Sequence, residues 1–373
     1  MVATLRVVLD QLVAPTEPVL AEASRDLTRA LIAGAPSGCQ VDGIAPAGGD
    51  GDPEVPGLAG LRRTALPRRE LAAALQLGVG TGIGGGMIHS PTLLAPLVKH
   101  DRVHDNDQTV VTIWDLRPWE SPADLPRAAV AWHKAMLKRA VKHADAVVVP
   151  THSLAERLGG IARVGDRVRV IAGAAPLGFT VPTDEVGRRR GLDLPEGFVL
   201  LAGGPVASDA LGTGFAAIAR SDVDLPIVVI DVEDGHEPAI ADLAAAAGVP
   251  EHRLHVRGAL EAADRAAVFG AAVAFLAPSR RSAFPWRVVD ALTLGVPVIA
   301  AASDVHGEVI FDGGELVEGA DDTSLAEGLG AALSTALATT DAADRLAVLS
   351  GDRGRSFSWR EAADKIWLLH AEL

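Results

Sequence analysis

The chain has 373 residues, more than one compact core usually holds, so its length predicts two domains. Hydrophobic residues make up 49% of the chain, a fraction that excludes a mostly disordered protein. Acidic residues outnumber basic ones by 48 to 34, and the net charge of −14 argues against nucleic-acid binding and against a basic face for anionic membranes. A ligand that carries phosphate would therefore need a local cluster of positive charge.

Cysteine is represented by Cys39 alone, which excludes a disulfide framework and a thiolate metal cluster. No uncharged apolar run reaches about 18 residues, the usual minimum for a membrane-spanning helix. The charged residues Arg6 and Asp10 come too early for a signal peptide. We therefore expect a cytoplasmic protein with no transmembrane segment.

Short apolar runs rich in valine and isoleucine alternate with amphipathic segments along the chain. Residues 5–9 predict a buried strand, and the next segment places six apolar residues on one helical face: Val19, Leu20, Ala23, Leu27, Ala30 and Leu31. Further buried strands are predicted at 110–113, 146–149, 168–171, 198–201, 227–230, 254–256, 273–276 and 296–300. Such strands, separated by helices, are typical of parallel sheets covered on both faces. We predict two doubly wound α/β domains, which bind ligands at the carboxyl ends of their strands.

Two stretches interrupt this alternation. Residues 45–60 are rich in glycine, proline and aspartate and predict an exposed loop. Residues 182–195 are charged, include Arg188, Arg189 and Arg190, and are predicted to link the two domains.

A glycine-rich segment lies at residues 78–86 and contains a formal G-x-G-x-x-G pattern. A dinucleotide site needs a strand before this pattern and a helix after it. Here a helical stretch at 70–77 precedes the glycines and a strand-like run at 87–89 follows. We therefore interpret the segment as a helix C-cap and a connection.

Several segments of the chain match those of a known protein family in their order and spacing. In the first half they are residues 87–97, 110–116, Trp132, 138–145 and 146–153. In the second half they are residues 198–204, 277–279, Phe284, 288–292, 295–299, Glu308 and 357–359. Together they resemble the family 4 glycosyltransferases, which have the two-domain GT-B fold. The resemblance implies an acceptor-side Rossmann-like domain, 1–182, completed by a C-terminal helix at 357–373, and a donor-side Rossmann-like domain, 183–356, facing a central cleft.

The resemblance implies a metal-independent retaining glycosyltransferase. It would move a hexose from a nucleotide diphosphate-sugar, UDP- or GDP-linked, to a glycan or lipid-linked acceptor, with no cofactor besides this donor. Family members hold the diphosphate with an Arg and a Lys just after the first strand of the second domain, because these groups suit its negative charge. Here that loop begins at Gly204 and carries Asp209 and Ala210 at the corresponding places.

The second family motif also differs in this chain. Its two glutamates correspond to Ser282 and Asp290. The first glutamate lies near the donor sugar in the family, and Ser282 supplies no carboxylate there. The second accepts hydrogen bonds from the ribose, a role that Asp290 could keep. The family's Gly-Phe-Gly becomes Ala283-Phe284-Pro285, and the proline removes one N–H donor.

The resemblance places two catalytic candidates, Asp115 and Ser282. Asp115 follows the strand at 110–113 and Trp114, which stands where many family members have a histidine. Asp115 is either catalytic or a strand-end residue that caps the following turn. His89 ends another strand-like run and is either a ligand contact or a packed histidine.

Positive charge gathers at Arg280, Arg281 and Arg287, around the end of a predicted strand. We predict that one or more of these arginines binds the donor's phosphates; the alternative is that they are solvated or pair with acids such as Glu308. By the resemblance, Glu308 is itself a donor contact. The donor-binding set that we predict is Gly204, Arg280, Arg281, Ser282, Phe284, Arg287, Asp290 and Glu308, with no metal ligand.

Two functions remain open from the sequence. The first is the glycosyltransferase, favoured by the polar residues that still outline the expected cleft. The second is a catalytically inactive homologue that acts as a binding or regulatory partner, in an oligomer or with an active glycosyltransferase. The missing Arg/Lys pair and the missing first glutamate favour the second.

Overall fold

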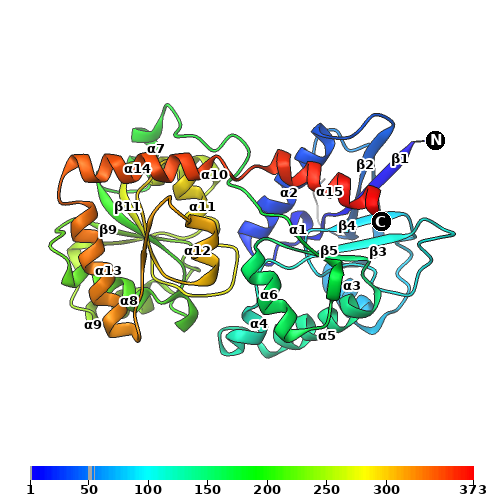
Figure 1. The fold of residues 1–373 in the computed structure, drawn as a ribbon, viewed down its shortest axis with the longest axis horizontal. Coiled ribbons are helices and arrows are strands. Elements are labelled where there is room, and N and C mark those ends of the chain that lie inside the picture. The colour runs from blue at the N-terminus through cyan, green and yellow to red at the C-terminus, as the bar shows by residue number, and fades with distance from the viewer. Residues whose placement is uncertain (1, 49–52, 54) are drawn as a thin grey trace. The chain divides into compact units, whose positions relative to one another are not determined.

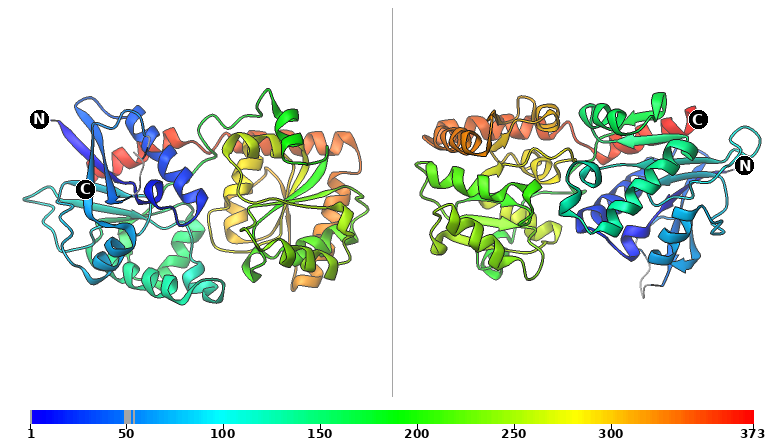
Figure 2. Two further views of the ribbon diagram at one scale, coloured as in Figure 1. Left: turned by 180° about the vertical axis from the view of Figure 1, so that it is seen from behind. Right: turned by 90° about the horizontal axis from the view of Figure 1, so that it is seen from below.

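The computed structural model describes residues 2–48, 53 and 55–373 (Figure 1). The chain forms two compact units: unit 1 contains Met1–Ala174 and Ser358–Leu373, and unit 2 contains Ala175–Phe357. Each unit is a parallel sheet covered by helices, which Figure 2 shows from two further sides. None of the helices in the described residues is long and apolar enough to cross a membrane.

The sheet of unit 1 has seven parallel strands in the order β3-β2-β1-β4-β5-β6-β7. The strands are β1 (Ala3–Val8), β2 (Cys39–Ala47), β3 (Gly60–Pro67), β4 (Met87–Ser90), β5 (Gln108–Thr112), β6 (Ala146–Val149) and β7 (Val168–Val170). The helices are α1 (Asp10–Val13), α2 (Pro18–Ala33), α3 (Arg68–Leu77), α4 (Arg117–Glu120), α5 (Arg127–His143), α6 (His152–Ile161) and α15 (Trp359–Glu372), with 3-10 turns at Pro122–Asp124 and Gly165–Arg167.

Both faces of this sheet are buried. Apolar side chains of α3, α5 and α6 form one core with the sheet. On the other face α2 and α15 pack against each other, and the indole N–H of Trp367 donates a hydrogen bond to the carbonyl of Leu31, 3.0 Å away. The last helix of the chain is therefore part of the core of unit 1.

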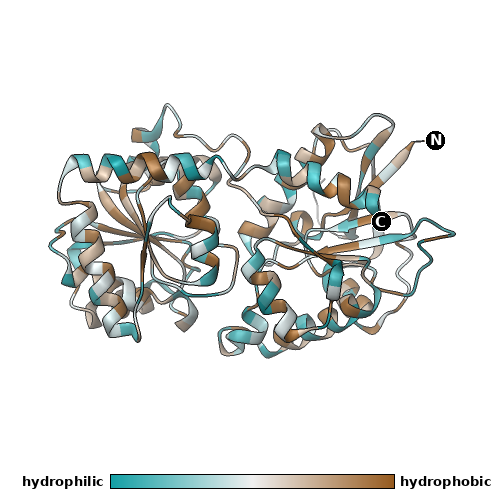
Figure 3. Cartoon of the chain, in the orientation of Figure 1, coloured by the Kyte–Doolittle hydropathy of each residue, from teal (hydrophilic) through white to brown (hydrophobic). Residues whose placement is uncertain are grey.

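The sheet of unit 2 has six parallel strands in the order β10-β9-β8-β11-β12-β13. They are β8 (Phe198–Ala202), β9 (Ile227–Ile230), β10 (Leu254–Val256), β11 (Ala272–Ala277), β12 (Val298–Ala301) and β13 (Glu315–Val317). The helices are α7 (Glu185–Gly191), α8 (Leu211–Arg220), α9 (Glu237–Ala246), α10 (Ala262–Ala271), α11 (Trp286–Thr293), α12 (Asp304–Ile310), α13 (Asp322–Ala336) and α14 (Thr340–Gly354), with 3-10 turns at Ala207–Asp209 and Glu251–Arg253. In Figure 3 the central strands are hydrophobic, and the helices carry hydrophilic residues as well.

The order of strands reverses at one point in each sheet. In unit 1 the chain turns back between β1 and β4, and in unit 2 between β8 and β11. At such a point the loops after two adjacent strands run in opposite directions and leave a crevice at the carboxyl ends, where open α/β sheets bind ligands. The predicted fold class, two doubly wound parallel-sheet domains, is confirmed.

Three of the strands were not predicted from the sequence: β2, β3 and β13. The nine residues of β2 include Asp42, Gly43 and Pro46, so they carry a turn-like composition within a buried strand. The predicted loop at 45–60 is therefore wrong at its start, since Ala45 is a fully buried part of β2. Residues 49–52 and 54 of that prediction lie outside the described residues. β3 and β13 are edge strands, whose apolar patterns are weak because less of each is buried.

The charged stretch at 182–195 is not a free linker. It contains α7, which packs against α10 inside unit 2, and Arg189 of this helix is only 6% exposed. The unit boundary lies after Ala174 and not after 182, because Phe179 packs edge-on against Phe269 at 6.5 Å and Val181 covers Gly270.

Candidate functional site

In unit 2 the strand reversal between β8 and β11 is bordered by two loops. One follows β8 at residues 203–210, and the other follows β11 at residues 278–285. The hydroxyl of Ser279 donates to the carbonyl of Ser208 at 2.6 Å and ties the loops together. Gly203 has a φ of +127°, and a Cβ there would lie 2.8 Å from a carboxylate oxygen of Asp209, so only glycine fits this close approach.

Gly204 and Arg281, two predicted donor-binding residues, both contact the carboxylate of Asp209 at this strand reversal. The backbone N–H of Gly204 donates to Oδ2 of Asp209 at 2.8 Å, and Nη1 of Arg281 lies 2.9 Å from Oδ1. The carboxylate is 15% exposed and the guanidinium 27%. An anion is thus held by one backbone N–H and one arginine, the arrangement that suits a phosphate oxygen.

Arg287 and Asp290 belong to a second, more deeply buried group of charges. Nη1 of Arg287 lies 2.8 Å from Oδ2 of Asp290, and its Nε lies 2.6 Å from Oδ2 of Asp231, just after β9. Nε of Arg265 on α10 reaches the same oxygen of Asp290 at 2.9 Å. Burial acts to lower the pKa of Arg287, but the charges of Asp231 and Asp290 outweigh it and raise that pKa. Two guanidinium groups and two carboxylates therefore neutralise one another.

This network changes the interpretation of Asp290. Its side chain is 3% exposed, and Oδ2 already accepts from both arginines. A ribose hydroxyl could reach this carboxylate only if Arg287 moved. The structure therefore gives Asp290 a role in holding α10 and α11 together.

The other predicted donor contacts in unit 2 are dispersed. Ser282 and Phe284 are buried, 4% and 2% exposed, and the Phe284 ring packs edge-on against Trp286 at 4.7 Å. Arg280 is exposed and donates to the carbonyl of Gly319. Glu308 lies on α12, where its backbone carbonyl accepts from Arg353 at 2.7 Å. Among the predicted arginines, Arg281 alone lies with Gly204.

Asp115, the first catalytic candidate, lies in unit 1 at the start of α4. Its carboxylate accepts from the backbone N–H of Arg117, and its Oδ2 lies 3.1 Å from Nε of the same residue. Nη2 of Arg117 also reaches Oε1 of Glu17 at 2.6 Å. These contacts are those of a residue that caps a turn, one of the two roles that the sequence left open.

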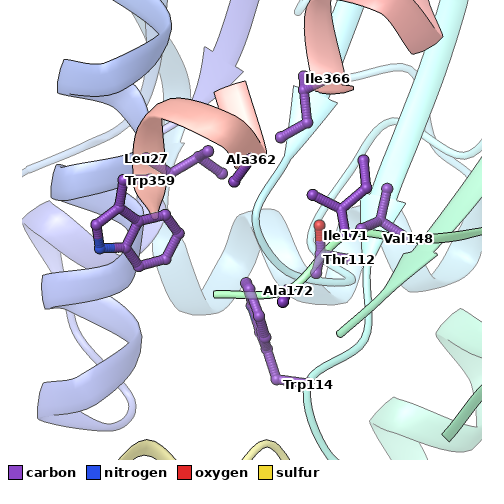
Figure 4. A pocket seen from close by; sticks show the side chains of 9 residues that line it. All are labelled: Leu27, Thr112, Trp114, Val148, Ile171, Ala172, Trp359, Ala362 and Ile366. Carbon is purple, nitrogen blue, oxygen red and sulfur yellow. The ribbon is translucent and has the colours of Figure 1, made fainter. Parts of the chain in front are cut away.

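Trp114, beside it in the chain, is buried and donates from its indole N–H to the carbonyl of Pro91 at 2.8 Å. It borders a small hollow beneath α15, shown in Figure 4. The hollow is lined by Leu27, Thr112, Trp114, Val148, Ile171, Ala172, Trp359, Ala362 and Ile366. Thr112 supplies the one hydroxyl of this lining, and none of the nine residues has an ionisable side chain, so the hollow offers packing surface without an acid or a base.

Sequence reasoning missed Asp10, which follows β1 at the strand reversal of unit 1. Its Oδ2 lies 2.9 Å from Nε of Arg68 and accepts from Gln11 at 2.8 Å, while Oδ1 has no hydrogen-bond partner among the described residues. Burial raises the pKa of Asp10, against the opposing charge of Arg68. The signal was available, since an acid directly after a buried strand is unusual.

His89, a possible ligand contact, is fully buried on β4. Its ring packs edge-on against His370 of α15 at 5.7 Å, and neither ring nitrogen has a hydrogen-bond partner within the described part of the chain. Burial, followed by the neighbouring His370, lowers the pKa of His89 well below its usual value. His89 is therefore a packed, neutral histidine. The residues described here include no group of three or more His, Cys, Asp or Glu side chains that could hold a metal ion.

Residues 208–335 match the family described as glycosyl transferases group 1. A D-inositol 3-phosphate glycosyltransferase of Xylanimonas cellulosilytica is 29% identical over 251 residues, which cover 63% of this chain and 58% of that protein. One of Stackebrandtia nassauensis is 30% identical over 250 residues, covering 61% of this chain and 54% of that protein. The chain thus spans little more than half the length of these relatives.

Solved structures share the fold over nearly the whole chain. Sucrose-phosphate synthase from Thermosynechococcus elongatus has a TM-score of 0.73 at 20% identity, covering 99% of this chain and 98% of that one. Anabaena Alr3699/HepE, in a complex with UDP and glucose, has a TM-score of 0.71 at 16% identity, with all of both chains covered. At these identities the likeness shows the architecture alone.

Proposed function

We propose that this chain is a GT-B glycosyltransferase and that it transfers a hexose from a nucleotide diphosphate-sugar to a glycan or lipid-linked acceptor. The match of residues 208–335 to the glycosyl transferases group 1 family and the shared fold support the proposal. The observation that carries the proposal is that the Gly204 N–H and the Arg281 guanidinium both donate to one carboxylate, that of Asp209, at the strand reversal of unit 2. Arg281 lies within the residues that match the group 1 family. We propose the cytoplasm as the compartment, in keeping with the single cysteine.

The chemistry asked of these groups is electrostatic. When the bond between the anomeric carbon and the diphosphate breaks, negative charge grows on the departing phosphate oxygens. A guanidinium and a fixed backbone N–H stabilise that charge, and removal of one such donor typically costs about a hundredfold to a thousandfold in rate. In this role Arg281 would hold the UDP- or GDP-linked donor. Metal independence and retention of the anomeric configuration are part of the proposal and are supported by the family resemblance.

The acceptor is proposed at the level of its class. D-inositol 3-phosphate, which the names of the two curated relatives contain, is the first acceptor to test. Simple glycans and lipid-linked sugars follow.

Release of UDP or GDP from a panel of nucleotide sugars, with and without these acceptors, tests the proposal. We expect release from one donor, unchanged by EDTA, and a product that keeps the donor's anomeric configuration by NMR. Arg281→Ala should lower the rate about a hundredfold or more, whereas Arg355→Ala, an arginine 82% exposed, should leave it unchanged. Absence of turnover with every donor, from a folded protein, would contradict the proposal.

A second candidate function is supported by a specific observation. Arg281 is paired with Asp209, and Arg287 is paired with Asp231 and Asp290. A homologue that no longer binds a donor would keep the fold with its cations neutralised in this way and act as a binding or regulatory partner. It would show neither donor turnover nor nucleotide binding, also when Asp209 is replaced.

A further inference from the structure

In the loop after β8 a carboxylate of the chain itself, that of Asp209, occupies the donors that we propose for the phosphate. The carboxylate of Asp209 makes a bidentate bridge, accepting from the Gly204 N–H on one oxygen and pairing with Arg281 on the other. Asp209 and Arg281 lie 72 residues apart in the sequence, so the bridge joins the loop after β8 to the loop after β11.

We propose that Asp209 is an internal competitor for the diphosphate of the donor, and that it sets how tightly unit 2 binds a nucleoside diphosphate. The inference rests on the proposed function for the identity of the ligand. Asp209 must leave Arg281 and Gly204 before phosphate oxygens can take its place.

The charges at this point explain the competition. With Asp209 in place the guanidinium of Arg281 is neutralised, and an arriving diphosphate meets a carboxylate of its own sign. A tethered group also competes at an effective concentration on the order of millimolar, as for a short linker. A nucleoside diphosphate must displace this carboxylate from Arg281 and Gly204 in order to bind. The apparent affinity of the protein for the nucleoside diphosphate is therefore lower than it would be without Asp209.

Exposure distinguishes this pair from the buried pairs that Arg265 and Arg287 make with Asp290. Asp290 is 3% exposed and is held by two arginines, so its network is closed to a ligand. Asp209 and Arg281 are 15% and 27% exposed and are reached from solvent. Among the described residues Asp209 makes one ion pair, whereas Asp290 makes two, so Asp209 is the easier carboxylate to displace.

The backbone next to Asp209 favours movement of this carboxylate. Asp209 ends the 3-10 turn Ala207–Asp209, and Ala210 after it has a φ of +54°, a left-handed conformation that non-glycine residues rarely adopt. Rearrangement of the turn could therefore relieve this strain while it withdraws the carboxylate.

Calorimetric titration of the full chain with UDP, and separately with inorganic pyrophosphate, tests the inference. Asp209→Asn removes the charge at constant size, and Asp209→Ala removes the whole carboxylate. Both should bind the two probes at least about tenfold more tightly than the wild type in low salt. Asp209→Glu keeps the charge and should stay within about threefold of the wild type.

Two further variants identify the cause of the gain. Arg281→Ala in the Asp209→Asn background should return the affinity to the wild-type level or below it, since the freed guanidinium would be gone. Asp242→Asn on exposed α9 removes the same charge from the same unit and should leave binding unchanged. Circular dichroism checks that each variant is folded.

Equal affinity of the wild type and both folded Asp209 variants for UDP and pyrophosphate would overturn the inference. So would a gain that survives the loss of Arg281, or one that Asp242→Asn reproduces. If neither neutral variant folds, tight micromolar binding of UDP by the wild type would overturn it, and binding weaker than millimolar would support it. The outcome is separate from the proposed function, because binding gained by Asp209→Asn without donor turnover supports the inference and contradicts the transferase.

Discussion

In unit 2 the buried arginines at the carboxyl ends of the strands are held by aspartates, whereas in unit 1 two histidines are buried side by side without a charged partner of their own. Arg265 and Arg287 share the carboxylate of Asp290. The ring centroids of His89 and His370 lie 5.7 Å apart, and the Nδ1–H of His370 donates a hydrogen bond to the amide oxygen of Gln108 at 3.0 Å.

The difference separates two physical solutions for a buried polar group. Ionised groups remain charged in unit 2 because each has an opposite charge at contact distance, so pH changes near neutrality leave them unaffected. Burial instead lowers the pKa of His89 and of His370 in unit 1, so these histidines are neutral. Unit 1 should therefore lose stability in mild acid through these two histidines, and unit 2 should lose stability when the carboxylate of Asp290 is removed.

The largest effect is expected for Asp290→Ala. The substitution removes the carboxylate that Arg265 and Arg287 share and leaves Asp231 as the remaining acid of this buried network, so we expect a loss of about 3–5 kcal/mol from the stability of unit 2. Hydrogen exchange followed by mass spectrometry measures each unit separately. Faster exchange should appear in β8 to β13 but not in β1 to β7, and exposed Asp242→Ala should change neither unit. A loss below about 1 kcal/mol would show that the network is not a stabilising unit.

The next effect is a pH dependence of the stability of unit 1 that comes from His370. Burial lowers the pKa of His370 to about 4, against the weaker opposing charge of Asp145. The unfolded chain takes up a proton near pH 6.5 and the folded chain only near pH 4, so the stability conferred by neutral His370 is complete above pH 6.5 and is lost as the pH falls toward 4. Between pH 7 and 4.5 this loss amounts to about 2–3 kcal/mol.

His370→Gln tests that dependence, since the amide can still hydrogen-bond to Gln108 but does not titrate. Urea denaturation at pH 7 and 4.5 should show a smaller pH effect on unit 1 in the variant than in the wild type. His252→Gln, at an exposed position of unit 2, should leave the effect as it is. Equal pH effects in the wild type and His370→Gln would remove His370 as the cause.

The smallest expected effect is the stability lost when a helix N-cap is removed, and it should be the same in both units. The hydroxyl of Thr151 accepts from the N–H of Leu154 and caps α6 in unit 1, and that of Ser303 accepts from the N–H of His306 and caps α12 in unit 2, both at 3.1 Å. Thr151→Ala and Ser303→Ala should each cost about 1 kcal/mol, measured by urea denaturation. A much larger loss in one unit would show that the units differ in more than their treatment of charge.

Much of the fold could be predicted from the sequence because a strand buried on both faces is apolar throughout. The runs that became β8 and β9 show this directly, with every residue of β9 buried. The pattern fails where burial is one-sided or mixed. Leu61 of β3 is exposed while Thr64 is buried, so no alternation marks this edge strand.

The position of the candidate site could be predicted from the sequence, but the ion pairs that its arginines make could not. Gly204 and Arg281 follow strands that became neighbours, so the sequence indicated the correct end of the sheet. That Asp209 would lie between them depends on the conformation of an eight-residue loop, including the left-handed Ala210. Pairing of Arg287 with Asp231 likewise joins residues 56 positions apart, which composition and spacing cannot reveal.

The position of α15 in unit 1 affects how the chain is made. Unit 1 contains the first strands of the chain and also Ser358–Leu373, with the whole of unit 2 between them. During synthesis, β1 to β7 emerge from the ribosome long before α15, the helix that accepts Leu31 as a packing partner and covers the hollow beside Thr112. Unit 2 can complete its core first, while unit 1 waits with an apolar face uncovered. A chaperone would therefore meet the amino-terminal half of this protein for longer than the half that follows it.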